Sequence, residues 1–467
     1  MCKFHMHSFH KASLYLLGAV ALSACTISPL KSNQELVDQS IPNASVPKQF
    51  QANQASKQDA VTVDDAWLKQ FNDPELNALV AEALQNNPSI RIIAARRTQS
   101  EALISAAGGS QYPGINAIGN SGSKVGSSGT GLTGFYIGAN WELDLWGRVR
   151  TSVAGAEQNS KAINADQDAA RLSLIATLAK SVWLARSLQE QAQLAKENAE
   201  ASQKISDLTQ VREKIGASSI NDVASAKINA AQAQELALNS ALARDQALRA
   251  VEILVGRYPK AELLKSTALP ALPKPVEPGL PADLLERRPD LIAAEARVNS
   301  AFYLADEKRL ARLPKISLTA GYGYINSQIF TLVNGASTSF GVGANVALPL
   351  FQGGAIEAQI AYQNAEAQAA LANYGKVVLA AFNDVENALN GEATWRERSS
   401  QLQTQLIQQK QVMKNTESEF QIGRVDQRQI QQQRIKTNTT DISWRQGQVD
   451  ALAQRINLYL ALGGSAD

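Results

Sequence analysis

The chain contains the same segment twice, and this internal duplication constrains its fold more than any other feature. FYIGANWELDLW (135–146) returns 205 residues later as FGVGANVALPLF (340–351). The residues around Pro88 align with those around Pro289 at an offset of 201, and from Ile215 onwards the offset is 207. Because the offset changes by only a few residues across the repeat, one ancestral unit has been duplicated.

Each copy predicts an unusually long helix followed by a shorter one. No proline occurs from Gly147 to Tyr258 or from Leu350 to the C-terminus, and both stretches are rich in Ala, Gln, Glu, Leu and Lys, which favour helix. Apolar residues recur at spacings of three and four between Leu172 and Ala185. Polar turns at Gly216 and Gly423 divide each stretch into a helix of about 65 to 70 residues and one of about 35.

A third helix is expected ahead of the strands in each copy, from Pro74 to about Ser110 and from Pro281 to about Arg312. Together with the shorter helix after the turn, it matches the length of the long helix, which at about 1.5 Å per residue measures on the order of 100 Å. Two short helices stacked end to end would therefore run beside one long helix. This pattern indicates a cylinder wall rather than a compact core.

Between the first helix and the long one, the apolar period changes from 3.6 to 2, which is typical of strands. The residues expected on one apolar face are Phe135, Ile137, Ala139, Trp141, Leu143, Leu145, Ile316, Leu318, Ala320, Tyr322, Tyr324, Phe340, Val342, Ala344, Val346, Leu348 and Leu350. Alternating strands of this length with aromatic residues near their ends fit an outer-membrane barrel, although a soluble hairpin with one buried face is the alternative. Four strands cannot close a barrel, so other copies of the chain would have to complete it.

The first 24 residues are predicted to be a secretory signal peptide. An apolar run, Leu14 to Ala24, follows Lys3 and Lys11 and is too short to span a bilayer. An N-terminal anchor helix is the alternative. The run ends in LSAC, which resembles the bacterial lipobox, so Cys25 would become the first residue of the exported chain and would carry a covalent lipid.

Composition argues against an enzyme. From Cys25 onwards the chain has no histidine and no other cysteine, which excludes Cys/His and Ser/His nucleophiles and cysteine/histidine zinc sites. The Asp and Glu residues form no constellation beyond a solvated helix face, and no P-loop is present. A net charge of +2 with scattered Lys and Arg gives no basic stripe for nucleic acid. We expect no cofactor other than the lipid on Cys25.

Five segments carry a family resemblance, and they span essentially the whole chain after the signal. They are FNDPELNALVAEALQNNPSI (71–90), WELDLWGRVR (141–150), DLLERRPDLIAAEARV (283–298), LPKISLTAGYG (313–323) and PLFQGG (349–354). In combination they resemble the TolC-like outer-membrane efflux proteins, in the lipoprotein branch typified by NodT and OprM. The resemblance implies a mainly α protein with a β-barrel part. It would be a homotrimer in which long coiled-coil helices form an α-barrel tunnel and four strands per chain enter a shared 12-stranded transmembrane barrel.

The resemblance also implies a function and a location. The protein would be the outer-membrane channel of a tripartite efflux system, a passive gated conduit that exports small molecules such as drugs. Its partners would be a periplasmic adaptor protein and an inner-membrane pump of the RND type. It would be lipid-anchored in the outer membrane of a Gram-negative bacterium, with most of its mass in the periplasm. A polypeptide secretion duct of the same fold and a non-conducting periplasmic coiled-coil lipoprotein remain alternatives.

The repeat and the resemblance together divide the chain into segments. They are a signal peptide (1–24), a lipidated N-terminal segment (25–65), a first repeat (66–258), a Pro-rich linker (259–281) and a second repeat (282–464). Within the repeats, β-hairpins are expected at about 113–146 and 314–351, and the turns after the long helices, called tips here, at about 213–222 and 420–430.

In the relatives, the tips close the tunnel. The resemblance therefore makes gate candidates of Asn221, Asp222, Phe420, Arg424, Asp426, Gln429 and Gln432. An acidic ring of the family falls on Gln429 and Gln432 here, which indicates a more neutral constriction, and Arg424 and Asp426 are candidate latches. Solvated coiled-coil surface is the alternative for each of them. Trp141, Trp146 and Phe351 are expected to anchor the barrel at the lipid interface.

Overall fold

The structure is a computed structural model, and it describes residues 31–43, 49–51, 61–62, 67–120, 132–277, 281, 284–327 and 337–464. The predicted signal peptide and Cys25 lie outside the described residues. The chain divides into two compact units. Unit 1 comprises Met1–Ser45, Ala95–Ala165 and Ile292–Val377, and unit 2 comprises Val46–Ala94, Asp166–Leu291 and Val378–Asp467.

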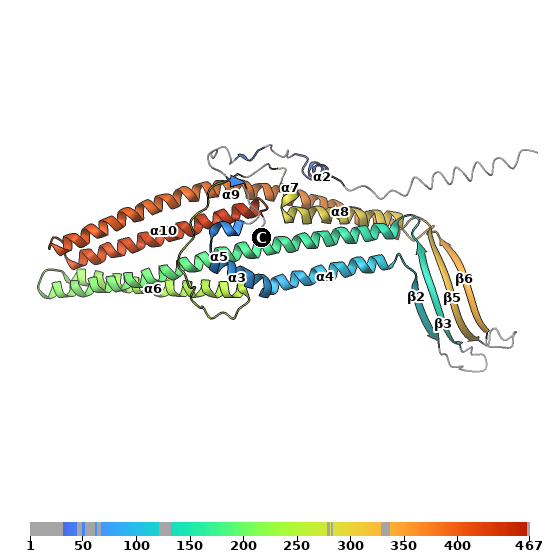
Figure 1. Cartoon of the computed structure of the whole chain (residues 1–467), viewed down its shortest axis with the longest axis horizontal. Coiled ribbons are helices and arrows are strands. Elements are labelled where there is room, and N and C mark those ends of the chain that lie inside the picture. The colour runs from blue at the N-terminus through green and yellow to red at the C-terminus, as the bar shows by residue number, and fades with distance from the viewer. Residues whose placement is uncertain are drawn as a thin grey trace, which may run out of the picture. The chain divides into compact units, whose positions relative to one another are not determined.

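The elements follow the duplicated order that the repeat predicts (Figure 1). They are α2 (Asn33–Ser40), β1 (Val61–Thr62), η2 (Trp67–Phe71), α3 (Pro74–Asn86), α4 (Pro88–Gly109), β2 (Gly114–Asn120), β3 (Leu132–Leu143), α5 (Arg148–Lys214), α6 (Ile220–Val255), β4 (Val276–Glu277), α7 (Leu284–Arg287), α8 (Pro289–Leu310), β5 (Lys315–Ser327), β6 (Ser337–Ala347), α9 (Ala355–Gln421) and α10 (Gln427–Ala461). The long helices α5 and α9 contain 67 residues each, and α6 and α10 contain 36 and 35. These lengths confirm the expectation from the proline-free stretches.

The first helix of each copy is broken, and the prediction of one continuous helix is wrong. α3 ends at Asn86 and α4 begins at Pro88, while α7 ends at Arg287 and α8 begins at Pro289. A proline clashes with a helical residue before it, and Asn87 accordingly has an extended conformation with ψ of 124°. The two prolines that help align the repeats therefore also divide its first helix.

In unit 2, each break holds the end of the helix that follows a tip. The Asn87 Nδ2 group donates a hydrogen bond to the carbonyl oxygen of Leu254 at 2.8 Å, and the Arg288 Nη1 group donates to that of Ala461 at 3.2 Å. The two pairs are related by the offsets of 201 and 207 that align the repeats. The duplication has therefore preserved the joint between the break and the helix end, although the donor is neutral in one copy and charged in the other.

A glycine lies against each joint. Gly256 and Gly463 have φ of +90° and +70°. A Cβ atom on Gly256 would lie 2.9 Å from the backbone oxygen of Asn86, and one on Gly463 would lie 3.0 Å from the backbone carbon of Arg287. Glycine is thus required twice at each position, by the left-handed backbone and by the close approach of the neighbouring chain.

The core of unit 2 is built around four aromatic side chains that are almost fully buried. Trp67 and Tyr459 stack with ring centres 5.4 Å apart, and Phe71 contacts Trp183 with ring centres 4.7 Å apart. They come from η2 and α5 of the first copy and α10 of the second, so the packing joins the two copies of the repeat. Aromatic pairs of this kind contribute about 0.5–1.5 kcal/mol beyond the area that they bury.

Beside this cluster, a buried ion pair ties α3 to α5. The Asp73 carboxylate caps α3 by accepting from the Leu76 amide at 3.0 Å, and it accepts from both Nη groups of Arg186. Both side chains are less than one tenth exposed. Burial by itself raises the pKa of Asp73, but the hydrogen bonds from Arg186 and Leu76 outweigh it and lower the pKa below its usual range.

The linker between the copies is irregular and lies along the helices of unit 2. Its carbonyl oxygens at Ala268 and Pro273 accept hydrogen bonds from Arg186 and Arg396 at 3.2 and 2.6 Å. Its one short strand, β4, pairs in parallel with β1. Arginine side chains from both copies therefore donate hydrogen bonds to carbonyl oxygens of the linker.

Unit 1 contains one antiparallel sheet with the strand order β2-β3-β5-β6. The hairpin of the first copy pairs with that of the second through β3 and β5, and the four strands lie side by side in Figure 1. The expected strands are too long at one end, because Leu145, Leu348 and Leu350 lie beyond β3 and β6. The chain turns at Asp144, whose carboxylate caps α5, and Pro349 has no amide to continue a ladder.

The joint glycines give a first prediction. Gly463→Ala should lower the melting temperature followed by circular dichroism, because the methyl group meets the backbone of Arg287 and φ stays positive. Gly423→Ala is a matched control, since Gly423 has φ of +74° and open space around its Cβ position. The left-handed backbone alone costs about 1–2 kcal/mol. A fall no larger than that of the control would show that the joint is not tightly packed.

The ion pair gives a second prediction. Because Asp73 has a lowered pKa in the folded chain, its stabilisation is complete above the unfolded pKa of about 3.9 and is lost as pH falls below it. Asp73→Asn should destabilise the chain at pH 7, but by less than the cost of a buried charge without any partner, about 3–5 kcal/mol, because Glu75 still binds Arg186 at 2.9 Å. The variant should also lose less stability than the wild type between pH 5 and 3. An equal loss of stability between pH 5 and 3 in the two proteins would contradict this assignment.

Candidate functional site

The strand register places most of the apolar side chains of the four strands on one face of the sheet, whereas Ile118 of β2 lies on the other face, opposite Tyr136. Residues that oppose each other in antiparallel strands share a face, and Ala117, Ile137, Tyr322 and Phe340 form one such row across β2, β3, β5 and β6. The side chains of Ile137, Tyr322 and Phe340 are 41, 57 and 73 % exposed. The single chain therefore presents an uncovered apolar face.

The opposite face is polar and rich in glycine. Its next row consists of Asn116, Gly138, Gly321 and Gly341, and its other members include Asn140, Glu142, Ser317, Thr319 and Asn345. A sheet that is apolar on one face and polar on the other suits a wall between lipid and water. Within the described sheet, β2 and β6 are paired on one side only.

The segment WELDLWGRVR forms the joint between β3 and α5. The Glu142 carboxylate binds Arg148 at 2.9 Å and Lys315 at 2.7 Å, and Arg148 also binds Glu307 on α8 at 3.0 Å. The Asp144 carboxylate accepts from the first amides of α5, those of Val149 and Arg150, at 3.0 and 2.9 Å. The charges of this motif thus fix where the strand ends and the helix begins.

The predicted interface anchors lie at the same end of the sheet. The Trp141 indole donates to the Gln111 carbonyl at 2.9 Å, and the Trp146 indole donates to the Pro314 carbonyl at 2.7 Å. Each tryptophan therefore ties a strand to the segment that enters its neighbour. Phe351 is 86 % exposed. Contact of these three residues with lipid stays a prediction.

The two tips, both in unit 2, share one design. After α5, Gly216 has φ of +74°, and Ser219 begins α6 with a capping box in which its hydroxyl and the Asp222 carboxylate bind each other's backbone amides. After α9, Gly423 has the same φ, and Asp426 begins α10 with a capping box that uses Gln429. Such boxes satisfy amides that a helix start leaves unpaired.

A contact between charged side chains joins the two tips. The Arg212 guanidinium at the end of α5 lies 3.7 Å from the Asp426 carboxylate, and Arg428 binds the same carboxylate at 3.0 Å. Hydrogen bonds from Ser219 lower the pKa of Asp222, and the positive charge of Arg428 adds to this effect. The acidic cap of each second helix is therefore held in its charged form close to arginine.

A groove of about 880 Å³ lies between α5, α6 and α10 beside this contact. Its charged lining residues are Arg212, Asp222, Arg428 and Lys436, so the groove carries an excess of positive charge. Gln432, one of the predicted gate residues, also lines it. This arrangement can hold the two tips together by charge.

The structure distributes the predicted gate residues over different roles. Asp222, Asp426 and Gln429 cap helices, Asn221 and Arg424 are exposed, and Phe420 is 42 % exposed. Asp426 forms the ion pair between the tips with Arg212, and Asp222 feels the charge of Arg428 across the same groove. Arg212, the partner of Asp426, was missed, because nothing in the local sequence links residues 212 and 426. Arg428 belongs to a polar run. Its position two residues after Asp426 could have indicated that it binds this carboxylate.

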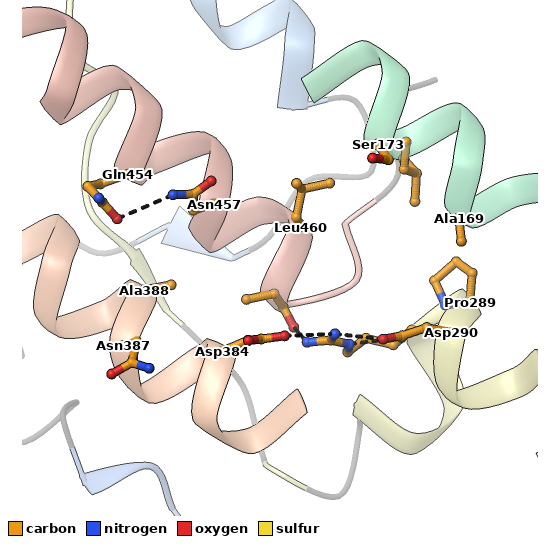
Figure 2. A pocket seen from close by; sticks show the side chains of 13 residues that line it. Ala169, Ser173, Pro289, Asp290, Asp384, Asn387, Ala388, Gln454, Asn457 and Leu460 are labelled. Atoms are coloured by element: carbon orange, nitrogen blue, oxygen red, sulfur yellow. Dashed lines mark hydrogen bonds and ion pairs between the residues drawn. The ribbon is translucent and has the colours of Figure 1, made fainter. Parts of the chain in front are cut away.

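A second cavity in unit 2, of about 530 Å³, surrounds the joint at Arg288 (Figure 2). Asp290 and Asp384 bind the Arg288 guanidinium at 2.7 and 3.2 Å, and Figure 2 labels both acidic residues among those that line the cavity. The amides of Gln454 and Asn457 line another side of the cavity and bind each other. Since the buried cation is already neutralised, this cavity belongs to the joint of the second copy.

Neither a metal site nor a helical membrane span is found in the described part of the chain. No group of three or more Cys, His, Asp or Glu side chains there could hold a metal ion. None of the described helices combines the length and the apolar character needed to cross a bilayer.

Comparison with known proteins matches both copies of the repeat to one family. Residues 79–257 and 280–464 match the model described as outer membrane efflux protein. The outer membrane protein OprJ of Pseudomonas aeruginosa is 26 % identical over 97 % of this chain and 95 % of its own length. The cation efflux system protein CusC of Escherichia coli is 26 % identical over 96 % and 97 %.

Solved structures agree with the fold. The outer-membrane channel OprN covers 95 % of this chain and 100 % of its own, with a TM-score of 0.77 and 24 % identity. The open state of the MtrE channel of Neisseria gonorrhoeae covers 95 % and 99 %, with a TM-score of 0.78 and 25 % identity. Because the family model covers both copies of the repeat, and the structure carries the strands and long helices of both, the chain belongs to the outer membrane efflux protein family.

Proposed function

We propose that three copies of this chain form a passive, gated channel that releases small molecules across the outer membrane. The observation that carries the proposal is the sheet of unit 1, which has one apolar face, one polar face and an unpaired edge on β2 and on β6. In lipid, unpaired backbone groups cost several kcal/mol each. Three four-stranded sheets joined edge to edge would give a closed barrel of twelve strands.

The helices support the same assembly. On α6, four apolar residues point to one side within about 80° of each other around the helix axis; they are Ile220, Ile228, Leu238 and Leu242. All four are more than half exposed in the single chain. An apolar stripe of this kind is covered when a neighbouring copy packs against it. The long helices of three copies would then line one tunnel.

The tips are the proposed gate. Opening requires them to move apart, a two-state change that contact with a periplasmic adaptor protein would bias. The sequence contains no P-loop, so the energy would come from a partner pump in the inner membrane, with the RND type as our proposal. We also propose that the chain is no enzyme and that Cys25 carries the lipid that helps to hold it at the membrane.

The names of the relatives support small molecules as cargo. One relative is described as a cation efflux protein, another as a toluene efflux protein and a third, OpmQ of Pseudomonas putida, as a pyoverdine export protein. These cargoes differ widely, which suits a conduit whose selectivity lies with its pump. A polypeptide duct would share the same sheet and helices, whereas a non-conducting spacer would leave the two faces of the sheet unexplained.

The assembly gives a third prediction. Light scattering of the detergent-extracted protein should give the mass of three chains, and negative-stain images should show hollow rods longer than about 100 Å, the length of the long helices. A Cys25→Ala variant should stay in the membrane as a trimer, because the barrel is the main anchor. A monomer that leaves the membrane in this variant would favour the spacer.

The tips give a fourth prediction. Arg212→Ala and Asp426→Asn should each raise the open probability in a planar bilayer, because each removes the contact between the tips. Asn keeps the cap of α10, since it is as good a cap as Asp. The pair is partly exposed and worth about 0.2–1 kcal/mol per copy, so we expect a change of several-fold. The double variant should resemble each single one.

Lys214→Ala is the matched control, because it removes the same charge from the same turn of α5. Lys214 has no ion pair among the described residues. An equal rise in this variant would mean that general charge, rather than the contact between Arg212 and Asp426, sets the opening.

A further inference from the structure

Tyr136 on β3 is the one aromatic side chain among the described residues of the polar sheet face. Its ring lies over three glycines, Gly138, Gly321 and Gly323. A Cβ atom on Gly138 would lie 2.5 Å from the Tyr136 Cε1 atom, and one on Gly323 would lie 2.9 Å from Cδ2. A Cβ atom on Gly321 would overlap the phenol oxygen. The ring thus occupies the space of side chains at Gly138 and Gly321, and at Gly323 it does so together with the backbone oxygen of Phe135, which lies 2.8 Å from the Cβ position.

The register explains how one ring reaches all three glycines. Gly323 is directly opposite Tyr136, whereas Gly138 and Gly321 face each other in the next row. A diagonal neighbour in the next row is within reach of an aromatic side chain. The ring therefore lies along the sheet from its own row into the next one and rests on bare backbone, which we call the glycine cradle (Gly138, Gly321 and Gly323).

The cradle has a limit on its far side. Gly341, on β6, is in the same row as Gly138 and Gly321, yet a Cβ atom there would have nothing within 4 Å. The glycines are therefore not equivalent. The Tyr136 ring covers Gly138 on β3 and Gly321 on β5, whereas Gly341 on β6 borders open space on the same polar face.

We propose that the glycine cradle holds Tyr136 flat against the wall and thereby sets the free width of the channel at this row. The inference rests on the proposed channel, in which the polar face lines the lumen. A side chain at Gly321 would overlap the phenol oxygen and displace the ring. Because the backbone of the sheet lies beneath the ring, and Ile118 of β2 lies beside Tyr136 in the same row, the ring would move away from the sheet into the lumen. Three copies would then place three rings across the same level.

A purely structural role for the ring is the competing explanation. Aromatic side chains placed over glycines stabilise sheets by covering exposed backbone. That role predicts a change in stability without a change in the conducting path. If the ring sets the width of the channel, a methyl group added to Gly321 should change the conductance only while Tyr136 is present. The two residues would then be coupled.

The test is single-channel conductance of the full-length protein in a planar bilayer, with the oligomer checked by light scattering. Gly321→Ala should lower the conductance relative to the wild type. Gly321→Ala with Tyr136→Ala should restore it to the value of Tyr136→Ala alone. Gly341→Ala, which adds the same methyl group to the same row without touching the ring, should leave the wild-type conductance unchanged.

Each outcome is decisive. Equal conductance in the wild type and in an assembled Gly321→Ala protein would overturn the inference, as would a loss that persists in the double variant or appears equally in Gly341→Ala. If Gly321→Ala does not assemble, Tyr136→Trp places a larger ring on the cradle and should lower the conductance instead. A wild-type protein without any current would overturn the channel itself, and this inference with it.

Discussion

The backbone hydrogen bonds of the four-stranded sheet are the constraint on which the proposed channel depends. Every backbone amide and carbonyl in the hydrocarbon region needs a partner in the protein. The chain meets this requirement inside its sheet, where the last strand of the first hairpin pairs with the first strand of the second, and leaves it unmet only at β2 and β6. Duplication of the hairpin doubles the number of strands but does not remove the two edges of the sheet, so in the proposed channel further copies would have to pair with β2 and β6.

The same duplication shapes the helices, and its two copies have diverged in charge. Asn87 and Arg288 do the same work at the two joints. Asn87 needs no counter-charge, whereas Arg288 is buried and depends on Asp290 and Asp384. A buried arginine without partners would be costly, which explains why two acidic residues lie beside the second joint. The motif around Pro289 is therefore understood as a structural joint of the second copy.

Much of this fold was predictable from the sequence because it rests on local patterns. The long helices follow from the absence of proline and the turns from Gly216 and Gly423, while alternation marks the strands. The capping roles of Asp222 and Gln429 were also written locally, as Ser219 and Asp426 each precede them by three residues. The breaks at Asn87 and Arg288 were missed although Pro88 and Pro289 signal them. The contact between Arg212 and Asp426 could not be predicted, because it joins distant segments that only the packed helices bring together.

Unit 2 contains one deeply buried ion pair and one exposed ion pair, and this difference bears on how the proposed gate would open while the rest of the unit stays folded. Arg186 and Asp73 are 3 and 7 % exposed, and separating them would leave a buried charge without its partner. Arg212 and Asp426 are 40 and 41 % exposed, and water can replace their contact at little cost. The capping boxes remain intact in either case, since each is made within its own helix start. The tips can therefore separate as rigid helix ends, with the aromatic core and the buried ion pair holding the rest of the unit in place.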